Sequence, residues 1–86
     1  MRKTTGKIDK RADVSEHEGR RKYGNVQFAD PTNEKYPIDS EEHVRAAWSY
    51  INQTDNASKY EASEVRTIKS RIKRAAKKHG VTIDEE

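Results

Sequence analysis

Hydrophobic residues recur at helical spacing along residues 61–80. Projected at 100° per residue, they fall within an arc of roughly 100°, the width of a stripe that faces a core. The members of this stripe are Val65, Ile68, Ile72, Ala75, Ala76 and His79. Glu64 in the first turn and Lys77 in the last complement the helix dipole. Gly80 suits the left-handed position that lets Val81 fold back. The pattern predicts one long amphipathic helix.

A shorter helical stripe precedes this one, with apolar residues at positions i, i+3, i+4 and i+7. Its members are Val44, Ala47, Trp48 and Ile51. Asp39 is the predicted N-cap, with Glu42 at the N3 position in an arrangement that resembles a capping box. The polar residues 52–56 end this helix, and a single turn is expected to bring Tyr60 into the core.

Residues 25–38 change from helical spacing to alternation. Val26 and Phe28 alternate with polar residues, and alternation resumes after the sequence Asp-Pro-Thr-Asn at 30–33, which has proline where a type I turn favours it. This predicts a small β-hairpin. Pro37 cannot donate to a ladder, so the second strand is expected to be an edge or a short bridge. An extended loop lying on the helices satisfies the same pattern.

These patterns together predict a mainly α fold, with a small α+β fold as the alternative. Two antiparallel helices with a short intervening turn are expected to pack on an N-terminal extended or hairpin-like segment, in one domain over residues 25–83. The predicted core residues are Phe28, Tyr36, Ile38, Val44, Ala47, Trp48, Ile51, Tyr60, Val65, Ile68, Ile72, Ala76 and Val81.

The N-terminal part of the chain offers little to a core. Up to residue 22, Met1, Ile8 and Val14 are its apolar side chains of any size, so the entropy lost on ordering would go uncompensated. The sequence therefore predicts a mobile charged arm over residues 1–24, in which glycines interrupt any helical turn. Residues 84–86 form an acidic tail.

Composition narrows the possible classes of protein. With 86 residues, 30% of them hydrophobic and 38% charged, the chain is one small domain with a small core. The absence of cysteine excludes disulfides and thiolate zinc sites. No apolar run is long enough to cross a bilayer, and no signal-peptide hydrophobic region follows the basic start. We expect no membrane association and a cytoplasmic location.

The net charge of +3 is unevenly distributed. Residues 1–27 carry eight Lys/Arg and four Asp/Glu, residues 28–61 carry three and seven, and residues 62–86 carry seven and four. Internal charge complementarity explains this pattern as readily as a binding surface does. If the surface is functional, its basic residues neutralise phosphates. The candidate nucleic-acid-binding residues are Arg20, Arg21, Lys22, Arg66, Lys69, Lys73, Arg74, Lys77 and Lys78.

No pattern of residues indicates catalysis. His17, His43 and His79 are scattered, and the chain lacks a cysteine nucleophile, a phosphate-binding glycine loop and a His-Glu metalloprotease motif. The polar cluster at 39–43 lies at a helix start, where consecutive side chains point in different directions and do not converge on one ion. We predict no enzymatic activity, no cofactor and no metal site.

Several short motifs resemble a small domain of unknown function that occurs in phage, prophage and bacterial proteins. They are YPI-acidic-HVR-A at 36–47, N-A-x-K-Y at 56–60 and A-A-K-K-x-G at 75–80. The resemblance covers about residues 28–83 and excludes the arm. One departure is Glu61, where Ser or Thr is expected before the second helix. The resemblance implies a phage-related setting, including attachment to head-assembly proteins in some members, and implies no activity.

Two functions fit the sequence. The first is a small non-enzymatic, phage-related binding module whose basic helix binds nucleic acid weakly and without sequence preference, because a continuous Lys/Arg stripe contacts phosphates without reading bases. The alternative is a protein-interaction or assembly accessory module, for example in phage head assembly, with an acidic protein as partner. Inhibition of a host nucleic-acid enzyme is a third hypothesis that no residue singles out. The oligomeric state is left open.

Overall fold

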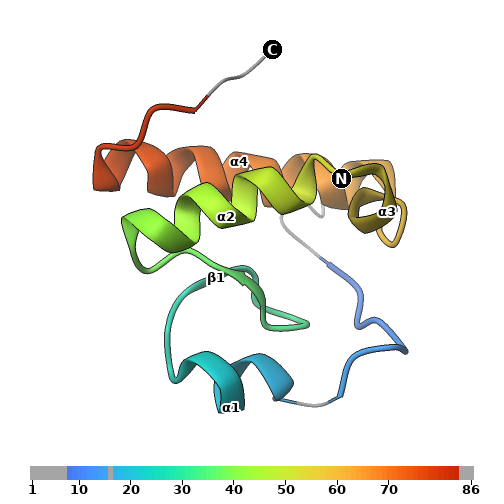
Figure 1. The fold of residues 1–86 in the computed structure, drawn as a ribbon. Helices are drawn as coiled ribbons and strands as arrows, with labels where there is room; N and C mark the ends of the chain where they lie inside the picture. Colours follow the sequence, from blue (N-terminus) through green and yellow to red (C-terminus); the bar gives the residue numbers. More distant parts are fainter. Residues whose placement is uncertain (1–7, 16, 84–86) are drawn as a thin grey trace, which may run out of the picture.

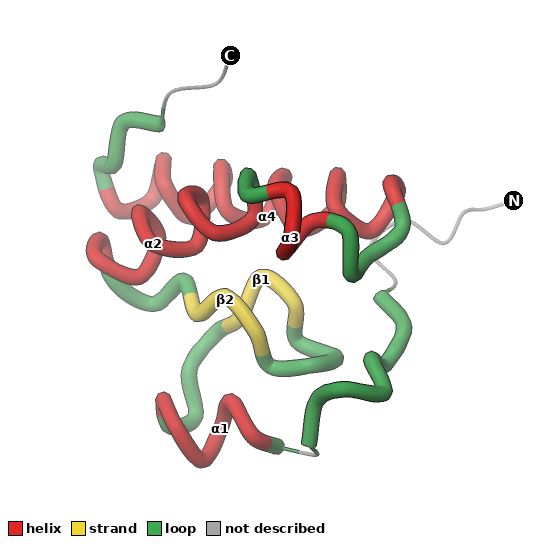
Figure 2. The backbone as a smooth tube through the Cα atoms, turned by 45° about the vertical axis from the view of Figure 1, so that its right-hand side comes forward, coloured by secondary structure: helices red, strands yellow, loops and turns green. Residues whose placement is uncertain are grey.

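The fold places two longer helices on one side of a small hairpin and a short helix on the other (Figures 1 and 2). The computed structural model describes residues 8–15 and 17–83. Within them the elements are, in order, α1 (Glu18–Tyr23), β1 (Phe28–Asp30), β2 (Lys35–Pro37), α2 (Glu41–Ile51), α3 (Thr54–Ala57) and α4 (Ala62–His79). About half of the chain is helical and the two strands form a sheet, so the fold is α+β. The mainly α expectation is therefore confirmed only in broad terms.

Helices α2 and α4 make the largest contact in the molecule and run in opposite directions (Figure 1). The start of α4 depends on Glu64, whose Oε1 accepts a hydrogen bond from the backbone N of Glu61 at 2.8 Å. This bond completes a capping box, so Glu61 is an adequate cap after all. At the other end Gly80 has φ 70°, and the backbone N of Val81 donates to the carbonyl of Ala76 at 2.8 Å. The predicted C-terminal stop is confirmed.

The start of α2 differs from the prediction. Its N-cap is Ser40, whose Oγ accepts a hydrogen bond from the backbone N of His43 at 3.1 Å. Asp39 lies one residue too early for this role. Its carboxylate instead contacts His43 Nδ1 at 2.6 Å, and this hydrogen bond lowers the pKa of Asp39. The His43 side chain therefore contacts both Asp39 and the ring of Tyr23, at 5.5 Å between centroids, while its backbone N–H is capped by Ser40.

The predicted hairpin is confirmed. Strands β1 and β2 are antiparallel, with Phe28 opposite Pro37 and Asp30 opposite Lys35. Because Pro37 has no N–H, pairing continues at the next residue, where the backbone N of Ile38 donates to the carbonyl of Gln27 at 2.9 Å. The strands touch different helices, β2 contacting α2 and β1 contacting α4.

Most of the predicted core is buried, and the exceptions lie at its edge. Tyr36, Trp48 and Val65 pack against the core but remain partly exposed. Ala29, which no periodic pattern singles out, is fully buried. The predicted residues that are buried are Phe28, Ile38, Val44, Ala47, Ile51, Tyr60, Ile68, Ile72, Ala76 and Val81. Among the described residues, no helix is both long and apolar enough to span a bilayer.

The segment predicted to be an arm packs onto the domain over the part that the structure describes. Ile8 is 4% exposed and belongs to the main core, and Val14 is 6% exposed. The backbone N of Asp9 donates to Glu64 Oε2 at 2.9 Å, which ties the segment to the start of α4. The few large apolar side chains that the structure describes in this segment are buried, and backbone hydrogen bonds of a kind that side-chain composition does not reveal add to its packing. Residues 1–7 and the acidic tail at 84–86 lie outside the described residues.

A buried polar network accounts for this packing. Asp30 is completely buried, and its carboxylate accepts hydrogen bonds from the Tyr60 hydroxyl at 2.6 Å, from Asn33 Nδ2 at 2.9 Å and from the backbone N of Asn33 at 3.1 Å. The Asn33 side chain also donates to the carbonyl of Asp9 at 3.1 Å and accepts from the backbone N of Arg11 at 2.6 Å. The hairpin and Tyr60 therefore meet at the Asp30 carboxylate, and Asn33 links the N-terminal segment to this network.

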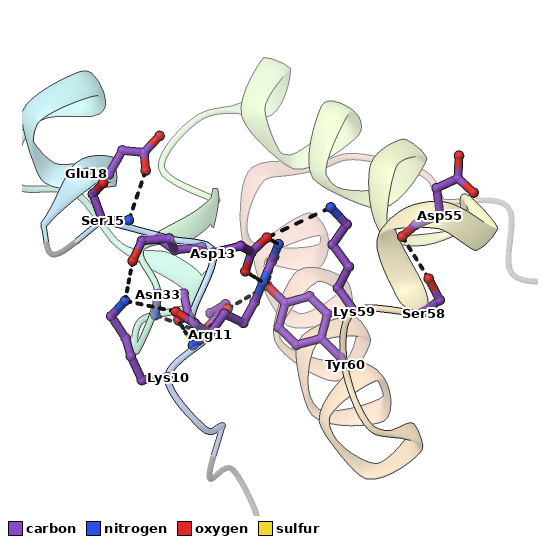
Figure 3. Close-up of polar contacts among 12 residues, drawn as sticks. Lys10, Arg11, Asp13, Ser15, Glu18, Asn33, Asp55, Ser58, Lys59 and Tyr60 are labelled. Carbon is purple, nitrogen blue, oxygen red and sulfur yellow. Dashed lines mark hydrogen bonds and ion pairs between the residues drawn. The ribbon is translucent and has the colours of Figure 1, made fainter.

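Arg11 closes the network on its outer side (Figure 3). Its Nη1 donates to the Tyr60 hydroxyl at 3.2 Å, and its guanidinium carbon lies 5.1 Å from the centroid of that ring. Asp13 forms an ion pair with Arg11, and this pairing lowers the pKa of Asp13 to about 2. Burial, and then the bond to Asp30, raise the pKa of Tyr60, so its hydroxyl remains a donor.

Replacing Ile68 with Ala should lower the free energy of unfolding by about 3 kcal/mol, because the side chain is fully buried between the layers. Trp48→Ala should cost less, since the indole lies at the edge of the core. Urea denaturation followed by circular dichroism measures both. Ser70→Ala on the exposed face of α4 is the control and should leave the midpoint nearly unchanged. An Ile68→Ala protein that unfolds like the parent would refute this core.

Replacing Tyr60 with Phe should lower the free energy of unfolding by roughly 1–3 kcal/mol, because it removes a donor from the buried Asp30 carboxylate. Tyr50→Phe, at a ring that is 53% exposed, is the matched control and should have no measurable effect. The same denaturation experiment decides the matter. Equal midpoints for the two variants would show that the network contributes nothing to stability.

Candidate nucleic-acid interface

The basic residues of α4 are divided by the way the helix packs. Between Val65 and His79 the helix has no acidic residue, and its apolar stripe faces α2 and the hairpin. The cations therefore occupy two flanks and an outer edge. Lys69 and Lys73 lie on the flank beside α2, whereas Arg71, Arg74 and Lys78 lie on the flank beside the hairpin.

On the α2 flank, the ammonium groups of Lys69 and Lys73 each lie 5.8 Å from the ring centroid of Trp48. Both distances are within the range of a cation–π interaction. Trp48 was predicted as a core residue, and it does pack against the core. The ammonium groups of two candidate residues, Lys69 and Lys73, also lie over its ring. The aromatic surface and the positive charge are thus adjacent on this flank.

On the hairpin flank, α4, residues 25–28 and α1 enclose a groove with a volume of about 570 Å³. We call it the basic groove. Its basic lining residues are Arg20, Arg71, Arg74 and Lys78. Its apolar lining residues are Val26, Phe28, Ile38 and Ala75. Arg20 comes from the segment that was predicted to be mobile, so only the tertiary structure brings it to the candidates of α4.

Two of the basic side chains in the groove are fixed by contacts with the hairpin. Arg71 Nη1 donates to the carbonyl of Ala29 in β1 at 2.9 Å. The backbone N of Arg20 donates to Glu34 Oε1 at 2.7 Å, and the guanidinium of Arg20 lies 3.5 Å from Glu34 Oε2. His17 Nδ1 contacts the same oxygen at 3.1 Å. The contact with His17, followed by the bond from Arg20, lowers the pKa of Glu34 and keeps it ionised.

The other two basic side chains in the groove are open to solvent. Arg74 and Lys78 are both exposed, and within residues 8–15 and 17–83 neither forms an ion pair with an acidic side chain. Their charge is therefore available to an anionic ligand.

Gly19 allows α1 to approach the hairpin closely. It is buried inside α1, and a Cβ at this position would overlap the backbone carbonyl oxygen of Glu34. Glycine is expected from the sequence to interrupt a helical turn here, whereas Gly19 lies inside α1 and is its point of contact with the hairpin. The position of Arg20 at the groove follows directly from this approach.

The remaining candidates lie outside the basic groove. Arg21 and Lys22 are exposed on α1, and the Lys22 ammonium lies 5.4 Å from the ring centroid of Tyr23. Arg66 and Lys77 are exposed on α4. The structure therefore gathers Arg20, Arg74 and Lys78, and it adds Arg71, which the sequence analysis did not include among the binding residues. The sequence feature that could have identified Arg71 is its position on the flank of the helix, next to the apolar stripe.

The acidic residues form no comparable centre. In the part of the chain that the structure describes, no three His, Asp or Glu side chains are placed to hold a metal ion. Asp39 and His43 contact each other, and Glu41 contacts Arg45 along α2. These pairs account for most of the polar cluster at the helix start.

Comparison with known proteins places the N-terminal segment within the same family match as the rest of the domain. A family of unknown function, DUF6582, matches residues 4–86. The match begins well before residue 28, where the motif resemblance was expected to begin, and so includes the segment that carries Ile8, Arg11 and Arg20. No curated protein and no solved structure matches the chain.

Replacing Gly19 with Ala should displace α1 from the hairpin, because the new methyl group has no space beside the Glu34 carbonyl. We expect faster cleavage by trypsin after Arg20, Arg21 and Lys22, measured by mass spectrometry under native conditions. Asn25→Ala, at an exposed position near α1, is the control and should be cleaved at the parental rate. Unchanged cleavage of the Gly19→Ala protein would contradict the close approach.

Proposed function

The chain belongs to DUF6582, a family of unknown function, and from its own residues we propose that it is a non-enzymatic module that binds nucleic acid through α4. Binding is weak and largely insensitive to sequence. The observation that carries the proposal is an 18-residue helix whose apolar stripe is buried while its cations remain on the surface. A phage-related setting, which the motif resemblance implies, belongs to the same proposal.

The cations of α4 from Arg66 to Lys78 form what we call the basic face, and its length suits a polyphosphate. From Arg66 to Lys78 the helix rises by about 18 Å at 1.5 Å per residue, and duplex DNA carries about ten phosphates over that distance. Each phosphate that is neutralised releases condensed counterions, which favours binding at low salt. Lys and Arg side chains placed along a stripe position a protein on phosphates without reading base edges.

The close spacing of like charges along α4 is a second reason to expect an anionic ligand. Lys69, Lys73 and Lys77 are separated by four residues each, as are Arg74 and Lys78. Like charges at this spacing destabilise a helix by about 0.2–0.5 kcal/mol per pair. A helix that served only to complete the core would be more stable with acidic residues among them. An anionic partner removes this repulsion.

A protein-interaction or assembly accessory role is the second proposal, and one observation favours it. Among the described residues, the large hydrophobic side chains that remain exposed are Tyr23 and Tyr50, at 37% and 53%. Both line a groove of about 330 Å³ that also includes Tyr36 and Pro37. Clustered exposed aromatic residues are typical of protein interfaces. An acidic protein partner would engage the same α4 cations.

The double variant Lys73→Glu with Lys77→Glu tests the nucleic-acid proposal. Fluorescence anisotropy with labelled duplex DNA, single-stranded DNA and RNA, at two salt concentrations, should show micromolar binding by the parent that weakens steeply with salt. The variant should bind at least tenfold more weakly, because two cations on the basic face become anions.

The control reverses the same number of charges elsewhere. Arg45→Glu with Lys59→Glu changes the net charge equally, at exposed residues that contact Glu41 and Asp13 rather than the basic face. It should lose far less affinity than the α4 variant. Equal affinity of the α4 variant and the parent would remove the part of α4 that carries Lys73 and Lys77 as the binding surface. No binding by the parent at low salt would reject nucleic acid altogether and leave the protein-interaction proposal.

A further inference from the structure

The geometry of the basic groove points to a particular form of nucleic acid. We infer that the groove binds a single strand, with phosphates on its cationic walls and a base against its apolar lining. This inference rests on the proposed function and adds to it the strand form and the place of binding.

The shape of the groove distinguishes it from the rest of the basic surface. Its cations stand on two elements, with Arg20 on α1 and Arg74 and Lys78 on α4, and between them the surface is hollowed to about 570 Å³. That volume lies within the roughly 300–1,000 Å³ of typical ligand sites. Arg66 and Lys77, on the outer edge of α4, are exposed cations that do not line the groove. The hollow of the groove can accept a group that projects from a phosphate backbone.

The lining of the groove suits a nucleobase. Val26 is partly exposed, and the largely buried side chains of Phe28, Ile38 and Ala75 form the apolar floor of the groove. Asn25 and Gln27 are exposed at the same groove and supply amide groups that hydrogen-bond base edges. In a duplex the bases are stacked and paired, whereas in a single strand they are free to leave the backbone and contact such a surface.

The cations in the groove are partly preorganised. The Arg71 guanidinium donates to the carbonyl of Ala29. Arg20 is anchored to Glu34 through its backbone N, and its exposed guanidinium forms an ion pair with the same carboxylate. Side chains that are already fixed lose less conformational freedom on binding. Glu34 is the acidic residue of the lining, and its ion pair with Arg20 offsets its charge. The groove therefore remains positive.

Two matched double variants test the inference. Arg74→Gln with Lys78→Gln removes two charges from the groove, and Arg66→Gln with Lys77→Gln removes two charges from the outer edge of the same helix. All four residues are exposed, so both proteins should fold, as circular dichroism would verify. Anisotropy is measured with labelled oligothymidylate and with a blunt duplex of equal length, at one fixed salt concentration.

We expect the parent to bind the single strand at least fivefold more tightly than the duplex. The groove variant should lose at least tenfold in single-strand affinity and lose this preference. The outer-edge variant should weaken both ligands by a similar factor and keep the preference. Val26→Glu, which places a carboxylate in the lining, should also abolish the preference while duplex binding changes little.

Other outcomes would separate this inference from the proposed function. Salt-dependent binding without strand preference, with equal losses in the two double variants, would overturn the groove and leave general binding by α4 intact. No binding of either oligonucleotide by the parent would overturn both. Displacement of the oligothymidylate by a polyglutamate peptide at equal charge concentration would show that the groove takes anions without a base contact, and would also overturn the inference.

Discussion

The fold depends on the satisfaction of one completely buried carboxylate. A buried charge is costly unless it is hydrogen-bonded on all sides, and Asp30 receives donors from Tyr60 and from both the backbone and side chain of Asn33. Asn33 in turn binds the backbone of the N-terminal segment at Asp9 and Arg11. This hydrogen-bond network therefore holds segments of the chain together beside a small apolar core. The network joins the hairpin, the N-terminal segment at Asp9 and Arg11, and Tyr60 just before α4.

The hairpin held by this network also shapes the candidate site. Its loop carries Glu34, which anchors α1 through Arg20, and its first strand offers the Ala29 carbonyl to Arg71. The two walls of the basic groove are therefore positioned from the same short element. A substitution at Gly19 or Asp30 would alter the shape of the groove, although neither residue belongs to its lining. Structure and proposed binding are coupled through the hairpin.

The surface charge is organised by packing rather than by sequence spacing alone. The apolar stripe of α4 separates Lys69 and Lys73, which lie over Trp48, from Arg71, Arg74 and Lys78, which lie in the groove. One flank pairs cations with an aromatic ring, and the other pairs them with a hollow apolar lining. These are different environments for an anion. The proposed single-strand site lies on the groove flank, where an apolar lining stands beside the cations.

The sequence by itself determined the hairpin, the course of α2 and α4, the Gly80 stop and most of the core, because periodicity, turn residues and helix ends are local properties of the chain. It misplaced the α2 cap, since Asp39 and Ser40 are both good capping residues and only the backbone geometry selects between them. Tertiary structure alone decided the packing of residues 8–15, the docking of α1 and the convergence of Arg20 with Arg74 and Lys78. These features rest on hydrogen bonds and close contacts between distant residues, which leave no periodic trace in a sequence.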